Sequence, residues 1–170
     1  MHPLLADLRR TGFTDLAGSR GAVDLAISEG LINRLLADAL ARSEGRLRGV
    51  TVTVLPEYRF DLDLRLSSGF LPSIAIEAVL DRQPSLPDAP ELVFRWRTRV
   101  PGLAALAGSA ASYFGKLPPG IRMEGDRVFA DLRPLFERAG AADLLPLLSE
   151  LRLSTRDHVV DVHLQARVPQ

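Results

Sequence analysis

The sequence contains no cysteine, one lysine and one tryptophan, and its formal net charge is zero. Without cysteine the chain can form no disulfide, offer no thiolate to a metal ion and use no cysteine nucleophile. The 21 basic and 21 acidic residues leave no excess of positive charge, which is the feature through which proteins hold nucleic acid. We therefore expect no nucleic-acid partner.

Long apolar runs are also missing. The longest stretch without a charge lies between Arg99 and Lys116, and it is shorter than the roughly 20 apolar residues that a membrane-spanning helix needs. Residues 1–30 lack the basic start and the apolar core of ~7–15 residues that mark a secretory signal. The chain as given is expected to be soluble and cytoplasmic, and an envelope location would require a leader that was removed.

Motifs that bind nucleotides or present a catalytic serine do not occur. The chain has no Gly-x-Gly-x-x-Gly, no P-loop and no Gly-x-Ser-x-Gly pattern. Ser109 and Ser112 lie in a stretch of small residues without a suitably placed histidine. We therefore expect no cofactor and no enzymatic activity.

One amphipathic stretch, from Ile27 to Leu40, organises the remaining pattern. Ser28 suits the N-cap of a helix, and Glu29 places a negative charge where the helix dipole favours one. Apolar residues then recur at three- and four-residue spacing and make one wide face: Leu31, Ile32, Leu35, Leu36, Ala39 and Leu40. The spacing predicts a helix over about 29–42, within a single domain of residues 22–170 that follows an N-terminal arm of residues 1–21.

Alternating apolar and polar residues predict about eight strands in the rest of the chain, from residues 22–27 to a final hairpin of 151–155 and 160–168. Short helices are expected at 131–138 and 141–148, and helical spacing recurs over 101–116. Short connections make consecutive strands antiparallel. The expected fold class is α+β: one long, highly curved antiparallel β-sheet wrapped around one main α-helix, plus two or three short helices.

One pair of aspartates could suggest acid–base catalysis, and one pair of histidines could suggest a metal site. Asp61 and Asp63 share a strand face, but general acid–base work needs one acid in an apolar pocket, and the alternation places both on the solvated side. His158 and His163 are five residues apart on an extended strand and point to opposite faces, so one metal ion cannot take both. The sequence therefore predicts no metal site.

A row of arginines, Arg95, Arg97 and Arg99, could hold an anion, a lipid headgroup or nucleic acid with an aromatic platform. Trp96, however, points to the opposite face of the same strand. The alternation favours cross-strand ion pairs with acidic residues of neighbouring strands, for which Asp61, Asp63, Glu77 and Asp81 are the candidates.

The remaining functional signal is an apolar surplus. We interpret it as an elongated hydrophobic slot between helix and sheet, large enough for a lipid or similar apolar molecule. The predicted ligand-lining residues are Leu35, Leu36, Leu40, Leu62, Leu64, Ile76, Phe94, Trp96, Val162 and Leu164. Leu103, Leu106 and Phe114 are predicted to form a lid or a lip that makes peripheral contact with a membrane.

The opening of the predicted helix resembles a family motif. Ile27-Ser28-Glu29, followed by Leu31, Ile32, Asn33, Leu35 and Leu36, is similar to the helix opening of small bacterial lipoprotein-like members of the TULIP superfamily, the tubular lipid-binding domains of the BPI and SMP type. The resemblance implies a long helix cradled by a curved sheet, with acyl chains bound between them.

A second hypothesis is a protein–protein interaction module with a filled core and no ligand. Its contact surface would be Leu103, Leu106 and Phe114, or the row from Arg95 to Arg99. An enzyme acting on a small apolar substrate is a third class, for which the sequence offers no catalytic set. The ligand and the oligomeric state do not follow from the sequence.

Overall fold

The computed structural model of the protein describes residues 10–11, 13–41, 47–66, 73–98 and 119–169. Its elements, in chain order, are η1 (Thr14–Leu16), β1 (Arg20–Ser28), α2 (Glu29–Ala41), β2 (Leu47–Leu55), β3 (Arg59–Leu66), β4 (Ile74–Arg82), β5 (Glu91–Thr98), β6 (Ile121–Glu124), β7 (Arg127–Asp131), α4 (Arg133–Arg138), η3 (Ala142–Leu147), β8 (Leu148–Arg156) and β9 (Val159–Arg167). Of the described helices, none has both the length and the apolar character needed to cross a membrane.

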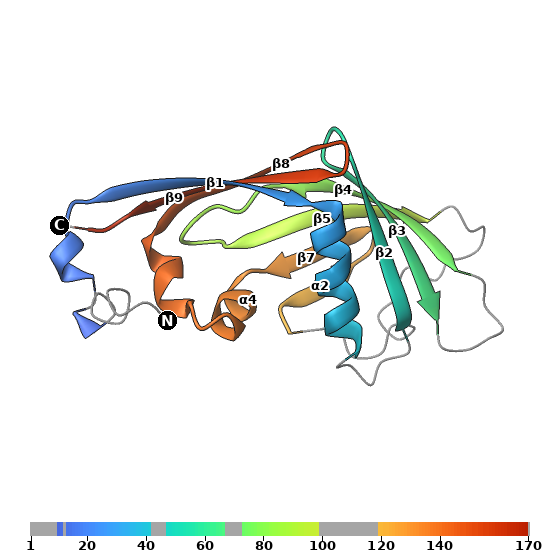
Figure 1. The fold of residues 1–170 in the computed structure, drawn as a ribbon, viewed down its shortest axis with the longest axis horizontal. Helices are drawn as coiled ribbons and strands as arrows, with labels where there is room; N and C mark the ends of the chain where they lie inside the picture. Colours follow the sequence, from blue (N-terminus) through green and yellow to red (C-terminus); the bar gives the residue numbers. More distant parts are fainter. Residues whose placement is uncertain (1–9, 12, 42–46, 67–72, 99–118, 170) are drawn as a thin grey trace.

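The described strands form two antiparallel sheets (Figure 1). One has three strands in the order β1-β9-β8, and the other has six in the order β2-β3-β4-β5-β7-β6. The predicted fold, one long sheet wrapped around one main helix, is therefore wrong. Alternation along a strand identifies its apolar face, but it does not identify the neighbouring strand, so nothing local revealed that β8 and β9 join β1 in a separate sheet.

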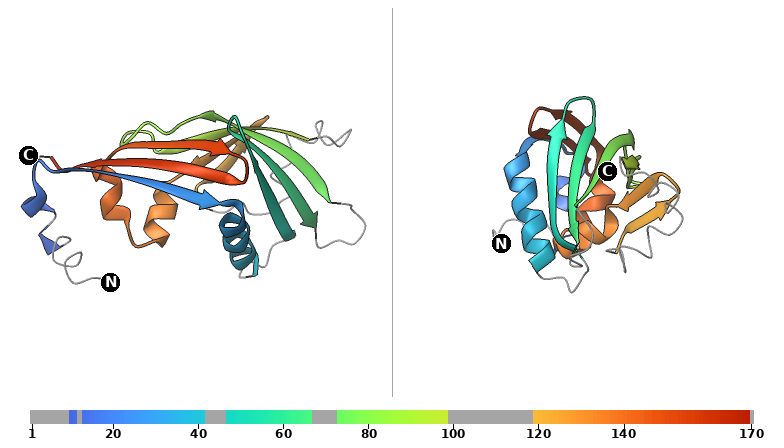
Figure 2. Two further views of the ribbon diagram at one scale, coloured as in Figure 1. Left: turned by 45° about the horizontal axis from the view of Figure 1, so that its top comes forward. Right: turned by 90° about the vertical axis from the view of Figure 1, so that its right-hand side faces the viewer.

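The predicted central helix has the predicted position in the sequence but not in space. It spans Glu29–Ala41, and its first turn is capped as expected, because the Leu31 amide donates to Ser28 Oγ at 3.3 Å. The helix lies alongside β2, the edge strand of the six-stranded sheet, as the right-hand view of Figure 2 shows. The amphipathic pattern predicted one buried apolar stripe, but only part of that stripe, including Ile32 and Leu36, packs against the core beside β2.

Most other predicted elements are found near their expected residues. The stretch at 141–148 is a 3-10 helix, Ala142–Leu147, with Pro146 inside it. A proline lacks the N–H that an α-helix interior needs, which accounts for the tighter turn. The segment 101–116, with its predicted helical spacing, lies outside the described residues.

Two clusters of buried residues form the core. The first consists of Leu80, Leu92, Leu132 and Leu151, from β4, β5, the start of α4 and β8. The second consists of Val52, Val54 and Val160, and α2 packs against it through Ile32 and Leu36. Leu153 of β8 packs against both clusters, so the two sheets share one interior.

A side-chain amide joins the two sheets where their strands do not pair. Gln83, directly after β4, donates from Nε2 to the Leu153 carbonyl oxygen at 2.7 Å and accepts the Leu153 N–H at 3.0 Å. Nearby, the Tyr58 amide in the β2–β3 turn donates to Thr155 Oγ1 at 2.7 Å. These contacts hold β8 against the six-stranded sheet without a backbone ladder between them.

Candidate functional site: the inner apolar face

The apolar sides of both sheets turn toward the shared interior, and we call this surface the inner face. In the six-stranded sheet its residues lie in lateral rows across the strands. One row runs through Val54, Phe60, Ala78 and Trp96, which are opposite one another in successive strand pairs. In the three-stranded sheet a corresponding row runs through Leu25, Val162 and Leu153. The predicted lining residues of the strands fall on this face, because side chains at every second position of a strand point to the same face of the sheet.

The predicted lining residues differ in how deeply they are buried. Leu64 and Trp96 are buried, with 6% and 7% of their surface exposed. Leu36, Leu62 and Val162 are half-buried against the second cluster, Phe94 and Leu164 are half-buried against the first, and Leu40 and Ile76 are half-buried. Leu35 is 58% exposed. The predicted lid residues Leu103, Leu106 and Phe114 lie outside the described residues.

The inner face is incompletely covered. The first cluster has four buried members and six partly buried hydrophobic residues packed against it, and the second has three and eight. Each partly buried member keeps part of its apolar surface in contact with water. The described part of the interior is therefore a surface that still reaches solvent.

Four exposed aliphatic residues lie on β1 and α2. Val23 and Leu25, on the inner face of β1, are 52% and 46% exposed, and Leu31 and Leu35, on one flank of α2, are 39% and 58% exposed. These four residues belong to two consecutive elements of the chain, and contiguous apolar surfaces are the ones that bind partners or ligands. We call these four residues the β1–α2 patch.

The opposite flank of α2 is bonded directly to β2. Asn33 donates from Nδ2 to the Val52 carbonyl at 2.8 Å, and its Oδ1 accepts the Val52 N–H at 2.7 Å. Glu29 Oε2 accepts the Val54 N–H at 2.8 Å. These hydrogen bonds hold α2 directly against the edge of β2 and leave no slot between the two elements.

The sequence interpretation missed these two roles. The sequence explains Glu29 by the helix dipole alone, and Asn33 enters the sequence analysis only as part of the TULIP-like motif. The signal in the sequence is the spacing of Glu29 and Asn33, because residues four apart share a helix face. A carboxylate and an amide beside an apolar stripe can hydrogen-bond the free backbone groups of an adjacent edge strand.

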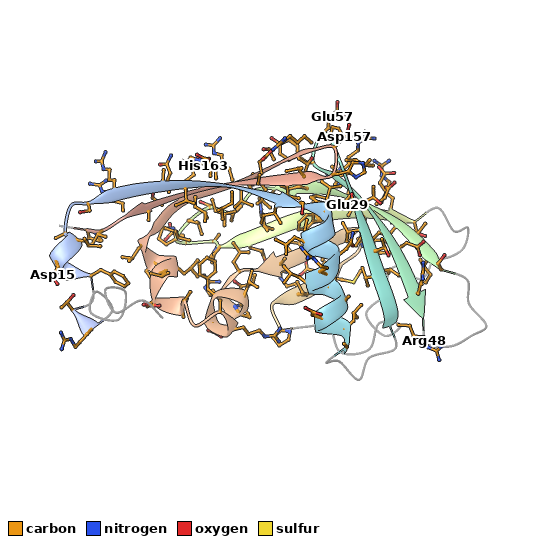
Figure 3. The ribbon with its side chains drawn as sticks, in the orientation of Figure 1. Asp15, Glu29, Arg48, Glu57, Asp157 and His163 are labelled. Carbon is orange, nitrogen blue, oxygen red and sulfur yellow. The ribbon has the colours of Figure 1, made fainter. Side chains whose placement is uncertain are left out.

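Glu29 also contacts His158, in the turn between β8 and β9. His158 Nδ1 lies 2.9 Å from Glu29 Oε2. Figure 3 shows Glu29 at the start of α2. The hydrogen bond from the Val54 N–H, and then the one with His158, lower the pKa of Glu29 below its usual value. The hydrogen bond and the charge of Glu29, with a smaller contribution from Asp157, raise the pKa of His158.

The outer face of the six-stranded sheet carries the predicted ion pairs. Arg95 pairs with Asp81, and an Arg97 nitrogen lies 3.8 Å from Glu77. Cross-strand pairing of this arginine row is thus confirmed for these two members, and Arg99 lies outside the described residues. Asp61 and Asp63 are half-buried, and one oxygen of Asp63 is buried without a partner in the described part of the chain.

A pocket of about 560 Å³ lies at the three-stranded sheet, and it is lined by polar residues such as Arg152 together with Leu25, Leu153 and Val162 of the inner-face row. His163 and Asp24 border it and are paired, Nδ1 to Oδ1, at 2.6 Å, and Gln165 Nε2 lies 3.0 Å from the other ring nitrogen. Figure 3 shows His163 on the side of this sheet away from the helices. Val162 is the one predicted lining residue that borders this pocket. Within the described residues, no group of three or more acidic or histidine side chains is arranged to hold a metal ion.

Comparisons of the chain with protein-family models, with curated proteins and with solved structures find no match. The resemblance to the TULIP superfamily therefore stays a prediction. The function has to be inferred from the inner face itself.

Proposed function

We propose that the protein binds a lipid or similar apolar ligand without catalysing a reaction, and that the ligand lies on the inner face beside the β1–α2 patch. The observation that supports the proposal is the incomplete burial of inner-face residues that would be buried in a filled core. The predicted TULIP resemblance is in keeping with the same function, although it implied a different arrangement of helix and sheet.

Physical chemistry makes such a site sufficient for binding. Removing apolar surface from water is favourable by ~25 cal/mol per Å², or about 0.8 kcal/mol for each methylene group of an acyl chain. Leu31 and Leu35 leave much of their surface in water in the free protein. A chain laid against them would remove apolar surface on both partners, and no catalytic polar group would be needed.

The chain supplies its own reporter for this test, because Trp96 is its single tryptophan and lies on the inner face. We expect native mass spectrometry of the purified protein to show a bound lipid. We also expect a fatty acid brominated along its chain to quench Trp96 fluorescence, whereas the soluble quencher iodide should have little effect on this buried ring.

Variants connect the signal to the proposed site. Leu25→Glu and Leu35→Glu place a charge on residues that are largely exposed, so folding should be retained while ligand affinity falls about tenfold or more. Leu135→Glu, which makes the same substitution at a residue of α4 that is 62% exposed, is the matched control and should bind as the wild type does. Absence of any bound lipid together with unquenched Trp96 would refute the proposal.

A further inference from the structure

Strand edges in this protein are closed by side chains at two places. On β2, the outward-facing groups of Val52 and Val54 are all bonded, to Asn33, to Glu29 and to the backbone N–H of His158, which donates to the Val54 carbonyl at 3.0 Å. On β8, the amide of Gln83 takes both backbone groups of Leu153. Free edges invite pairing with other strands, so these contacts protect the two sheets.

The outer edge of β1 has no such protection. The strand is nine residues long, pairs with β9 along its whole length, and makes no backbone hydrogen bond on its other side within the described residues. Every residue from Arg20 to Ala26 is exposed. A long open edge with exposed Val23 and Leu25 is a template on which another strand can add.

The charges on β1 indicate which strand would fit. Arg20 lies directly opposite Arg167 of β9, and in the described part of the chain neither guanidinium has an ion pair. Like charges directly opposite each other across a strand pair are unfavourable. Asp24, on the same sheet face as Arg20, is 82% exposed and contacts His163. The strand thus carries one unpaired cation and one accessible carboxylate, four residues apart.

We propose that β1 pairs antiparallel with β1 of a second copy of this chain, about a two-fold axis through Ala22. In this register Arg20 of each copy lies opposite Asp24 of the other, so two ion pairs form by symmetry. Val23 lies opposite Gly21 of the second copy, where open space surrounds the glycine Cα. The result is one six-stranded sheet, β8-β9-β1 followed by the same strands of the second copy in reverse order.

Other registers lack this match. An axis through Asp24 would set the two Asp24 carboxylates against each other, and an axis through Val23 would set Asp24 against Ala22 and leave Arg20 without an acid. A register displaced by one residue would bring the apolar face of one copy beside the polar face of the other. The charge pattern therefore selects the axis at Ala22.

Sedimentation velocity over a range of protein concentrations tests the association. We expect a reversible monomer–dimer equilibrium, weakened by salt because its ion pairs are exposed. Arg20→Asp should raise the dissociation constant about tenfold or more, since two attractive pairs become repulsive. Arg34→Asp makes the same charge change at an exposed position of α2 and should leave the equilibrium unchanged.

Cross-linking tests the register. The chain has no cysteine, so Ala22→Cys introduces a single thiol on the proposed axis, where the two Cα atoms would be close enough for a disulfide. Ala26→Cys, on the same exposed face, would hold its two thiols ~27 Å apart in the proposed dimer. We expect rapid oxidation to a covalent dimer with the first variant and not with the second. A protein that stays monomeric at all concentrations, or a dimer indifferent to Arg20→Asp, would overturn the proposal, whether or not a lipid binds.

Discussion

At the scale of single residues, His158 connects three segments that are far apart in the chain. Its backbone N–H donates to Val54 of β2, and its carbonyl accepts the N–H of Glu29 at 2.8 Å. Its ring bonds the Glu29 carboxylate, which in turn accepts from Val54. The residue adopts a φ of 61°, a left-handed conformation that is uncommon outside glycine and in which asparagine, aspartate and histidine occur more often than other residues. One turn residue thus fastens the β8–β9 hairpin to both α2 and β2.

The ring of His158 should make stability depend on pH. Its pKa is raised from 6.5, so its contribution is fully present below about pH 6.5 and is lost as the pH rises through the folded-state value. The pKa of Glu29 is lowered from 4.5, so its contribution is present above about pH 4.5 and is lost as the pH falls through its own folded-state value. The pair is therefore most stabilising between these two limits.

His158→Asn removes the titrating ring while keeping a residue that tolerates a positive φ. We expect the wild type to exceed this variant in thermal stability by a larger margin near about pH 5.5 than near about pH 8.5. Thermal unfolding followed by circular dichroism at both pH values measures the margin. A margin that is the same at both would show that the Glu29–His158 contact contributes nothing that titrates.

At the scale of secondary-structure elements, side-chain amides take the place of missing strand neighbours. Asn33 presents a donor and an acceptor to Val52 of β2, much as a neighbouring strand would, and Gln83 does the same for Leu153 of β8. Each amide lets an element end a sheet without leaving backbone groups unpaired, which would be unfavourable where water is excluded. The position of α2 beside β2 follows from this contact as much as from apolar packing.

Asn33→Leu keeps a side chain of similar size and removes both hydrogen bonds. The Val52 N–H and carbonyl would then be left partly buried and unpaired, so we expect a loss of about 2 kcal/mol in the free energy of unfolding. Arg34→Leu, at the next and exposed position, should change stability by less than about 0.5 kcal/mol. Denaturant unfolding measures both, and equal effects would indicate that the amide contacts carry no stability.

The limits of prediction from this sequence lie at the same scale. Period-two alternation located the strands and the side of each that turns inward, so Leu62, Phe94 and Val162 were placed on the inner face. Helical spacing also predicts α2, but it puts Leu35 and Leu36 on the same buried stripe. Of these two, only Leu36 packs against the core, because β2 covers only one flank of the wide stripe and leaves Leu35 exposed. The division into two sheets depends on the pairing of β1 with β9, a long-range contact that local patterns do not encode.

At the scale of the whole molecule, two sheets are fastened into one folding unit. Leu153 packs against both core clusters, and Gln83 bonds its backbone from the other sheet. Neither sheet covers its apolar side without the other, because each cluster includes residues from both. The two sheets should therefore unfold together.

Fluorescence of Trp96 reports on the six-stranded sheet, and far-UV circular dichroism reports on both sheets. We expect their unfolding transitions to coincide, as two-state behaviour requires. Leu153→Ala should lower both midpoints together and reduce stability by about 2 kcal/mol, because the residue is half-buried and shared. Leu135→Ala, at a residue that is 62% exposed, is the control and should have little effect. Separate transitions would show that the sheets are independent domains.

Asn33, Gln83 and His158 each bond a strand edge, and their side chains differ in how they respond to pH. Asn33 and Gln83 carry no ionisable proton, so their hold on the strand edges is the same in acid and in alkali. The imidazole–carboxylate contact at the hairpin tip is the fastening that titrates. A change in acidity would accordingly loosen the tip of the β8–β9 hairpin first, while the two sheets stay joined along the rest of their common boundary.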